Sequence, residues 1–136
     1  MVKLLTGGTG SGKSKKLIEM ANEAVKEARG NIIFVDDDNR NIHELDQPIR
    51  FINLEEYFIT NLDQFYGFIS GLLSGNYDIE TIFVDGLDNF SQLDPDSLDR
   101  ELDTFEKIAK ANEVDLILCF NGNVDNLSER AKQILI

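Results

Sequence analysis

The chain contains little cysteine, histidine or proline, and these scarcities exclude several kinds of protein. Its 136 residues include one cysteine (Cys119), one histidine (His43), two prolines and no tryptophan. A single cysteine cannot form an internal disulfide framework, and two isolated side chains provide neither a metal site nor a catalytic dyad. The sequence therefore argues against a disulfide-stapled scaffold and against a cysteine–histidine enzyme.

Long apolar runs are also missing, although the overall hydrophobic content is ordinary. No stretch reaches the roughly 20 apolar residues that a membrane-spanning helix needs, and the first residues do not form a signal peptide. The 42% of hydrophobic residues are enough for a buried core. We therefore expect one soluble cytoplasmic domain over residues 1–136, without a membrane span.

Basic side chains are few and unevenly distributed. There are 13 against 25 acidic side chains, which gives a formal charge of −12. Residues 1–30 hold six basic and three acidic side chains, so this is the only net positive part of the chain. An acidic protein repels nucleic acid and anionic membranes, whereas a local positive field suits a small anionic ligand. We expect no direct nucleic-acid partner and a ligand site near the N-terminus.

What the sequence does contain is an alternation of short apolar runs and amphipathic segments. Apolar runs predict strands, and apolar residues at spacings of three and four predict helices between them. Such alternation is typical of a mainly parallel sheet covered by helices on both faces, with ligands at the carboxyl ends of the strands. We predict an α/β fold, a three-layer α/β/α sandwich. The strands are expected at 2–6, 32–35, 48–52, 81–84 and 114–120, and the helices at 13–28, 61–74, from 94 onward, and 127–135.

A glycine-rich loop carries the strongest functional signal. Residues 7–14 fit G-x-x-x-x-G-K-[ST] between a predicted strand and a predicted helix. In such a loop, backbone N–H groups cradle phosphates, the lysine reaches the β- and γ-phosphates, and the hydroxyl coordinates Mg²⁺. The predicted nucleotide-binding residues are Gly7, Gly8, Thr9, Gly10, Ser11, Gly12, Lys13 and Ser14, with Lys13 also assigned a catalytic role.

This loop resembles that of the P-loop NTPases. Across residues 5–14 it is similar to the phosphate loop of pilus-retraction (twitching-motility) ATPases, and the chain also resembles short uncharacterised bacterial ATP-binding proteins. The motors' histidine-rich motifs are not present, so the resemblance implies nucleotide binding and not motor function. It implies a P-loop NTPase fold, with ATP and Mg²⁺ as the ligands.

A second element of the same kind is the apolar strand that ends in Asp85. This strand resembles a Walker B element, whose Asp holds Mg²⁺ together with the loop hydroxyl, here that of Ser14. Many ATPases place a glutamate base directly after this Asp, but Gly86 occupies that position. The metal ligands are therefore predicted, and the base is not found at its usual place.

The order of elements resembles the RecA-like division, in which the base follows the second strand. The string from Phe34 to Asp38 is similar to that strand and its acidic pair, which makes Asp38 the candidate for orienting the attacking water. Asp88 is an alternative base. Asn121, after the last strand, resembles the polar sensor that contacts the γ-phosphate, although Asn121-Gly122 also reads as a turn.

Three functions remain open at this point. An ATPase fits the loop and Asp85. Its turnover is expected to be slow, because no arginine finger can be named among Arg40, Arg100 and Arg130. A nucleotide-binding switch or scaffold, working through a protein partner, fits the missing glutamate. A small-molecule kinase would need a lid and an acceptor pocket as well. ATP is preferred over GTP because a guanine-reading N-K-x-D element is absent.

Overall fold

The computed structural model describes residues 1–8, 10, 12–89 and 93–136. Within them the chain forms a five-stranded sheet and four α-helices. The strands are β1 (Val2–Gly7), β2 (Asn31–Asp36), β3 (Arg50–Asn53), β4 (Ile79–Val84) and β5 (Asp115–Asn121). The helices are α1 (Lys13–Glu27), α2 (Leu62–Gly75), α3 (Pro95–Asn112) and α4 (Glu129–Gln133).

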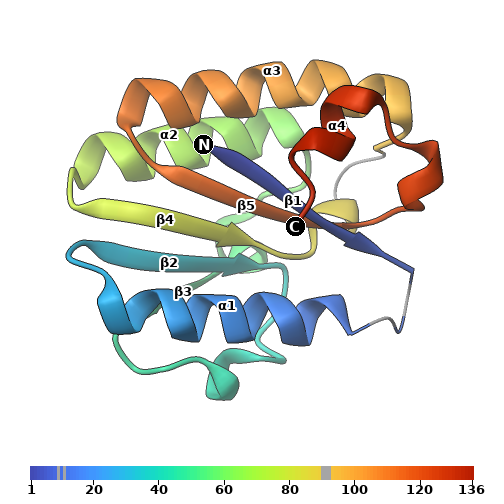
Figure 1. Cartoon of the computed structure of the whole chain (residues 1–136). Coiled ribbons are helices and arrows are strands. Elements are labelled where there is room, and N and C mark those ends of the chain that lie inside the picture. The colour runs from blue at the N-terminus through green and yellow to red at the C-terminus, as the bar shows by residue number, and fades with distance from the viewer. Residues whose placement is uncertain (9, 11, 90–92) are drawn as a thin grey trace.

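All strand pairs are parallel, and the strands lie in the order β1-β5-β4-β2-β3. Figure 1 shows α1 on one face of the sheet and α2, α3 and α4 on the other, so the predicted three-layer α/β/α sandwich is confirmed. Because β5 lies between β1 and β4, the segments that follow these three strands lie side by side at the carboxyl end of the sheet.

Alternate residues of each strand enter two separate cores. On the α2 and α3 side, Ile33 and Val35 pack with Phe65 and Phe105. On the α1 side, Phe34 stacks between two other rings, with centroid distances of 6.4 Å to each. Burying one such side chain contributes about 1.5–3 kcal/mol. The strands of a doubly covered sheet are apolar on both faces, which is why they read as continuous apolar runs.

Polar side chains cap the starts of α2 and α3. Asn61 accepts a hydrogen bond from the Gln64 N–H, and Asp94 forms a capping box with Ser97 at the start of α3. The predicted closing helix over 127–135 is too long. Ser128 caps α4, which ends at Gln133, and Leu135 then pairs in parallel with Leu4 of β1. The open edge of β1 offers backbone partners that an exposed extra helical turn does not.

Gly30 follows α1, which ends with Ala28 as its extended C-cap. A Cβ on Gly30 would lie 2.2 Å from the backbone oxygen of Asp78. Gly30 is therefore needed for the close approach of two turns at the amino end of the sheet. No helix among the described residues is long and apolar enough to cross a membrane.

Candidate functional site

The loop between β1 and α1 adopts a conformation that depends on glycine. Gly10 and Gly12 have φ of +82°, in the left-handed region that side chains rarely adopt, and Gly12 directly precedes α1. A Cβ on Gly8, Gly10 or Gly12 would have no neighbour within 4 Å. Gly10 and Gly12 are therefore required by their backbone conformation, and not because a side chain at these positions would clash with neighbouring atoms. Of the predicted residues, Thr9 and Ser11 lie outside the described part of the chain.

Lys13 and Ser14 lie in the first turn of α1 and line a cavity of about 340 Å³ at the carboxyl end of the sheet. The Lys13 ammonium lies 3.5 Å from the carbonyl oxygen of Gly8, so it folds back over the loop. Among the described residues no side chain caps α1, and the first turn of this helix has no acidic residue. The free N–H groups and the positive end of the helix dipole therefore face the cavity with Lys13, an arrangement suited to an anion.

Asp85 stands across this cavity at the end of β4 and is only 7% exposed. Its N–H donates to the Val35 carbonyl (2.8 Å), and its carboxylate accepts the Gly86 N–H (2.8 Å). The structure thus brings Ser14 and Asp85, the two predicted metal ligands, to one cavity. A hydroxyl and a carboxylate are oxygen donors of the kind that Mg²⁺ prefers, so the chemistry of the two residues fits this ion.

Gly86 makes room for carboxylates from the neighbouring strand. Its φ is +74°, and a Cβ there would lie 2.7 Å from Asp37 Oδ1 and 3.0 Å from Asp36 Oδ1. Asp37 also accepts a short hydrogen bond from the Asn89 side-chain amide. The acidic side chains at the end of β2 therefore occupy the space beside Asp85 that a side chain at position 86 would need.

Asp36 is buried within this acidic group, at 4% exposure. Burial, then a hydrogen bond with Asp37 and the charge of Asp85, raise the Asp36 pKa to about 8. Its carboxylate also accepts the Asp37 N–H at 2.7 Å. Three acidic side chains from two strand ends thus face one cavity, where a bound cation would relieve their mutual repulsion.

Asp38, the predicted base, does not line the cavity. Its carboxylate accepts hydrogen bonds from the Arg40 N–H (2.9 Å) and guanidinium (2.8 Å), and these bonds hold the Asp38 pKa below its ordinary value. Asp37 and Arg40 line the cavity instead. Three consecutive acidic residues carry no sequence signal that tells which one turns inward, so Asp37 was missed.

Asn121 and Asp88 lie together in the cavity. The Asn121 N–H donates to Asp88 Oδ2 at 2.6 Å, and both residues line the cavity. Burial raises the pKa of Asp88, whereas the Asn121 hydrogen bond and the charge of Lys13 lower it. The structure therefore places the predicted sensor at the cavity and also the alternative base. Asn41 and Asn89 also line the cavity, and no sequence motif singled them out.

The comparison with solved structures supports the fold. The chain is similar to the crystal structure of flagellar accessory protein FlaH from Methanocaldococcus jannaschii, with a TM-score of 0.58 and 14% sequence identity. The similarity covers 98% of this chain and 65% of the FlaH chain, so this chain spans less than two thirds of the length of FlaH. No protein-family model and no curated protein matches the sequence. At this identity the likeness shows the fold alone.

Proposed function

We propose that this chain binds ATP with Mg²⁺ at the cavity and hydrolyses it slowly, as a RecA-like P-loop protein. The observation that carries the proposal is that Gly10 of the glycine loop, Lys13, Ser14 and Asp85 line one cavity at the carboxyl end of the sheet. Gly7 to Ser14 would hold the phosphates, and Lys13 would balance their charge. ATP is preferred over GTP because the chain lacks the guanine-reading element.

Ser14 and Asp85 would hold Mg²⁺, with Asp36 close to them. When bound, the ion neutralises phosphate charge that develops as the terminal phosphoryl group leaves. Asn121 would contact the γ-phosphate, because it lines the cavity at the end of β5, between the ends of β1 and β4.

Asp37 is a better candidate than Asp38 for orienting the attacking water. It lines the cavity and occupies the space beside Gly86, next to the Asp85 that would hold the metal, whereas Asp38 is paired with Arg40. In hydrolysis the water oxygen bonds to the γ-phosphorus, the bond to the leaving ADP oxygen breaks, and the carboxylate holds the water proton. Arg40 forms a salt bridge with Asp38. Turnover is therefore expected to be slow unless a partner protein supplies a cation to the phosphates.

Calorimetric titration of ATP, ADP and GTP with Mg²⁺ tests the binding step. Lys13→Ala should weaken ATP binding at least about 100-fold, because the phosphates lose their charge partner. Lys15→Ala is the matched control, since Lys15 is exposed in the same turn and lines no cavity near the loop. Equal affinity in the wild type and Lys13→Ala would contradict the proposal.

Phosphate release measured on the same samples separates the remaining functions. Release that depends on Lys13 supports an ATPase, and tight binding without release supports a switch that acts through a protein partner. The switch stays a candidate because Asp37 is held by Asn89 and must still accept a water. A kinase would transfer the phosphoryl group only when an acceptor is added.

A further inference from the structure

A second cavity of about 360 Å³ lies directly beside the first. Asp37 and Asn89 line both cavities, and the hydrogen bond between their side chains belongs to the wall that the cavities share. A ligand in the second cavity would therefore be a neighbour of the phosphates in the first. The described lining residues are Asp37, Glu55, Phe58, Ile59, Thr60 and Asn89.

The lining combines negative charge with apolar surface. Asp37 and Glu55 supply two carboxylates, and Phe58 and Ile59 supply an aromatic ring and an aliphatic side chain. The Thr60 hydroxyl and N–H both donate to Gln64. Among the described lining residues none is basic. A positively charged group attached to a short apolar chain complements such a surface, because the charge meets carboxylates and the chain meets carbon.

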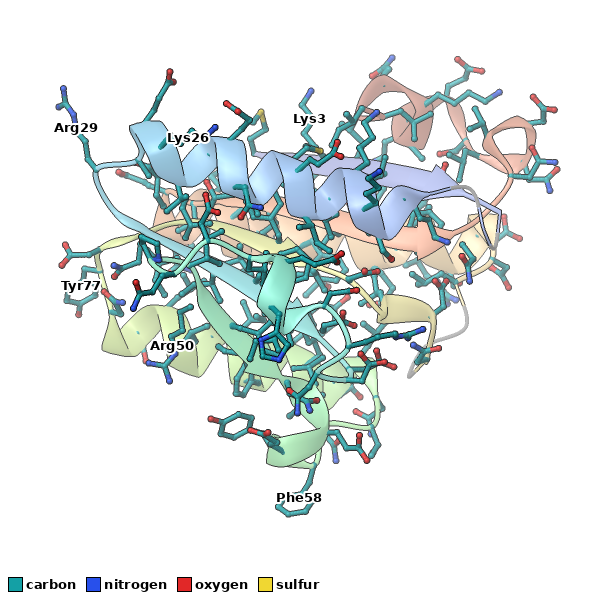
Figure 2. The ribbon with its side chains drawn as sticks, turned by 90° about the horizontal axis from the view of Figure 1, so that it is seen from below. Lys3, Lys26, Arg29, Arg50, Phe58 and Tyr77 are labelled. Atoms are coloured by element: carbon teal, nitrogen blue, oxygen red, sulfur yellow. The ribbon has the colours of Figure 1, made fainter. Side chains whose placement is uncertain are left out.

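Phe58 is held at the rim in an unusual conformation. Its φ is 60°, in the left-handed region, and the residue is 83% exposed. The preceding Tyr57 packs on Phe68 with ring centroids 5.4 Å apart, which anchors the turn. Figure 2 shows Phe58 projecting from the surface, well away from Tyr77. An exposed aromatic residue in a strained backbone adds little to the core, so its ring is available to a ligand.

We propose that the second cavity binds an alkylguanidinium or alkylammonium group. The charged head would lie between Asp37 and Glu55, and the alkyl chain would lie against Phe58 and Ile59. Binding of the cation itself does not require a nucleotide. The part of the proposal that rests on the proposed function is its coupling: a cation at the shared wall should bind more tightly when a nucleoside triphosphate fills the first cavity.

NMR titration with n-butylguanidinium and n-butylurea tests the site, since the two probes share a shape and differ in charge. Butylguanidinium should shift the amide signals of Ile59, Thr60 and Asn89, and butylurea should bind at least about tenfold more weakly. Glu55→Gln should weaken butylguanidinium binding at least about fivefold. Glu56→Gln is the matched control: it removes the same charge from the same turn but does not line the cavity.

The aromatic contact has its own matched pair. Phe58→Ala should weaken binding about threefold or more, whereas Tyr77→Ala should have no effect. Tyr77 is 94% exposed and lies outside the cavity. Equal losses in Glu55→Gln and Glu56→Gln would mean that the probe responds only to the acidic surface, and this would overturn the proposal. Equal binding of butylurea would overturn it as well.

Two further arms identify the source of the cation and isolate the proposed function. N-acetyl-arginine amide should bind as well as butylguanidinium if the natural ligand is a polypeptide side chain, and more weakly if it is a small molecule. The gain in butylguanidinium affinity caused by ATP–Mg²⁺ should be lost in Lys13→Ala, because this variant no longer holds the nucleotide in the first cavity. If ATP does not bind at all, the cation titration still decides whether the second site exists.

Discussion

The two ends of the sheet use glycine for different purposes. At the amino end, a Cβ on Gly30 would lie 2.2 Å from the backbone oxygen of Asp78, which cannot turn aside. At the carboxyl end, a Cβ on Gly86 would lie 2.7 Å from a carboxylate oxygen of Asp37, which belongs to a side chain that can rotate. One glycine therefore serves the fold, and the other serves the arrangement of acidic groups in the cavity.

Gly30→Ala should give the largest effect on stability. The new methyl group forces two backbone segments apart, and we expect a loss of at least about 3 kcal/mol in the free energy of unfolding. The melting temperature should fall by about 10 °C or more. The protein that remains folded should bind ATP normally, because the cavity lies at the opposite edge of the sheet. A melting temperature within 2–3 °C of the wild type, on the order of 1 kcal/mol, would contradict this.

Asp37→Asn should give the next largest effect, on turnover and not on folding. The amide cannot hold the water proton, so we expect phosphate release to fall about 100-fold, or about 2.7 kcal/mol in the activation barrier. ATP binding should change little. Asp38→Asn is the matched control and should retain turnover, because Asp38 is turned toward Arg40. Loss of turnover in Asp38→Asn alone would restore the base that the sequence suggested.

Gly86→Ala should combine a small structural cost with a change in the cavity. The left-handed backbone costs an alanine about 1 kcal/mol, and displacing Asp37 adds a similar amount. We therefore expect a loss of about 2 kcal/mol in stability together with slower phosphate release. Gly67→Ala is the control: it lies within α2 with open space around its Cβ and should stabilise the helix slightly. Unchanged release in Gly86→Ala would mean that Asp37 need not occupy this space.

The strands and the loop could be predicted from the sequence because their signals are local. Ile32 to Val35 form a continuous apolar run, and the spacing from Gly7 to Ser14 fixes the strand–loop–helix unit around it. The inward turn of Asp37 could not be predicted. It depends on the parallel register of β2 and β4, which brings Gly86 beside the end of β2, and only the folded sheet sets that register.

The helical C-terminal segment shows a second limit. The residues from Leu127 to Leu135 have a helical apolar spacing, but Leu135 forms a bridge with Leu4 instead. Local periodicity does not reveal that β1 lies at an edge of the sheet with free backbone groups. Contacts between strands far apart in the sequence therefore decide both the inward turn of Asp37 and the pairing of Leu135 with β1.

The smallest expected effect concerns the charge on Asp36 in metal-free protein. Its pKa is raised from 3.8 to about 8 in the folded state, first by burial. Between these values the folded protein keeps a proton that the unfolded chain loses, so stability declines as pH rises and the contribution is gone above about 8. Asp36→Asn removes this titration while its amide oxygen can still accept the Asp37 N–H.

Thermal unfolding of both proteins in EDTA from pH 6 to pH 8 measures the difference. The advantage of Asp36→Asn over the wild type should grow with pH by about 1 kcal/mol, because neighbouring carboxylates share the repulsion. Asp38→Asn should show no such trend, since the pKa of Asp38 is lowered and its titration is complete below this range. A constant difference for Asp36→Asn would mean that the buried carboxylate is already ionised at pH 6, and that the acidic end of the cavity is better solvated than its 4% exposure indicates.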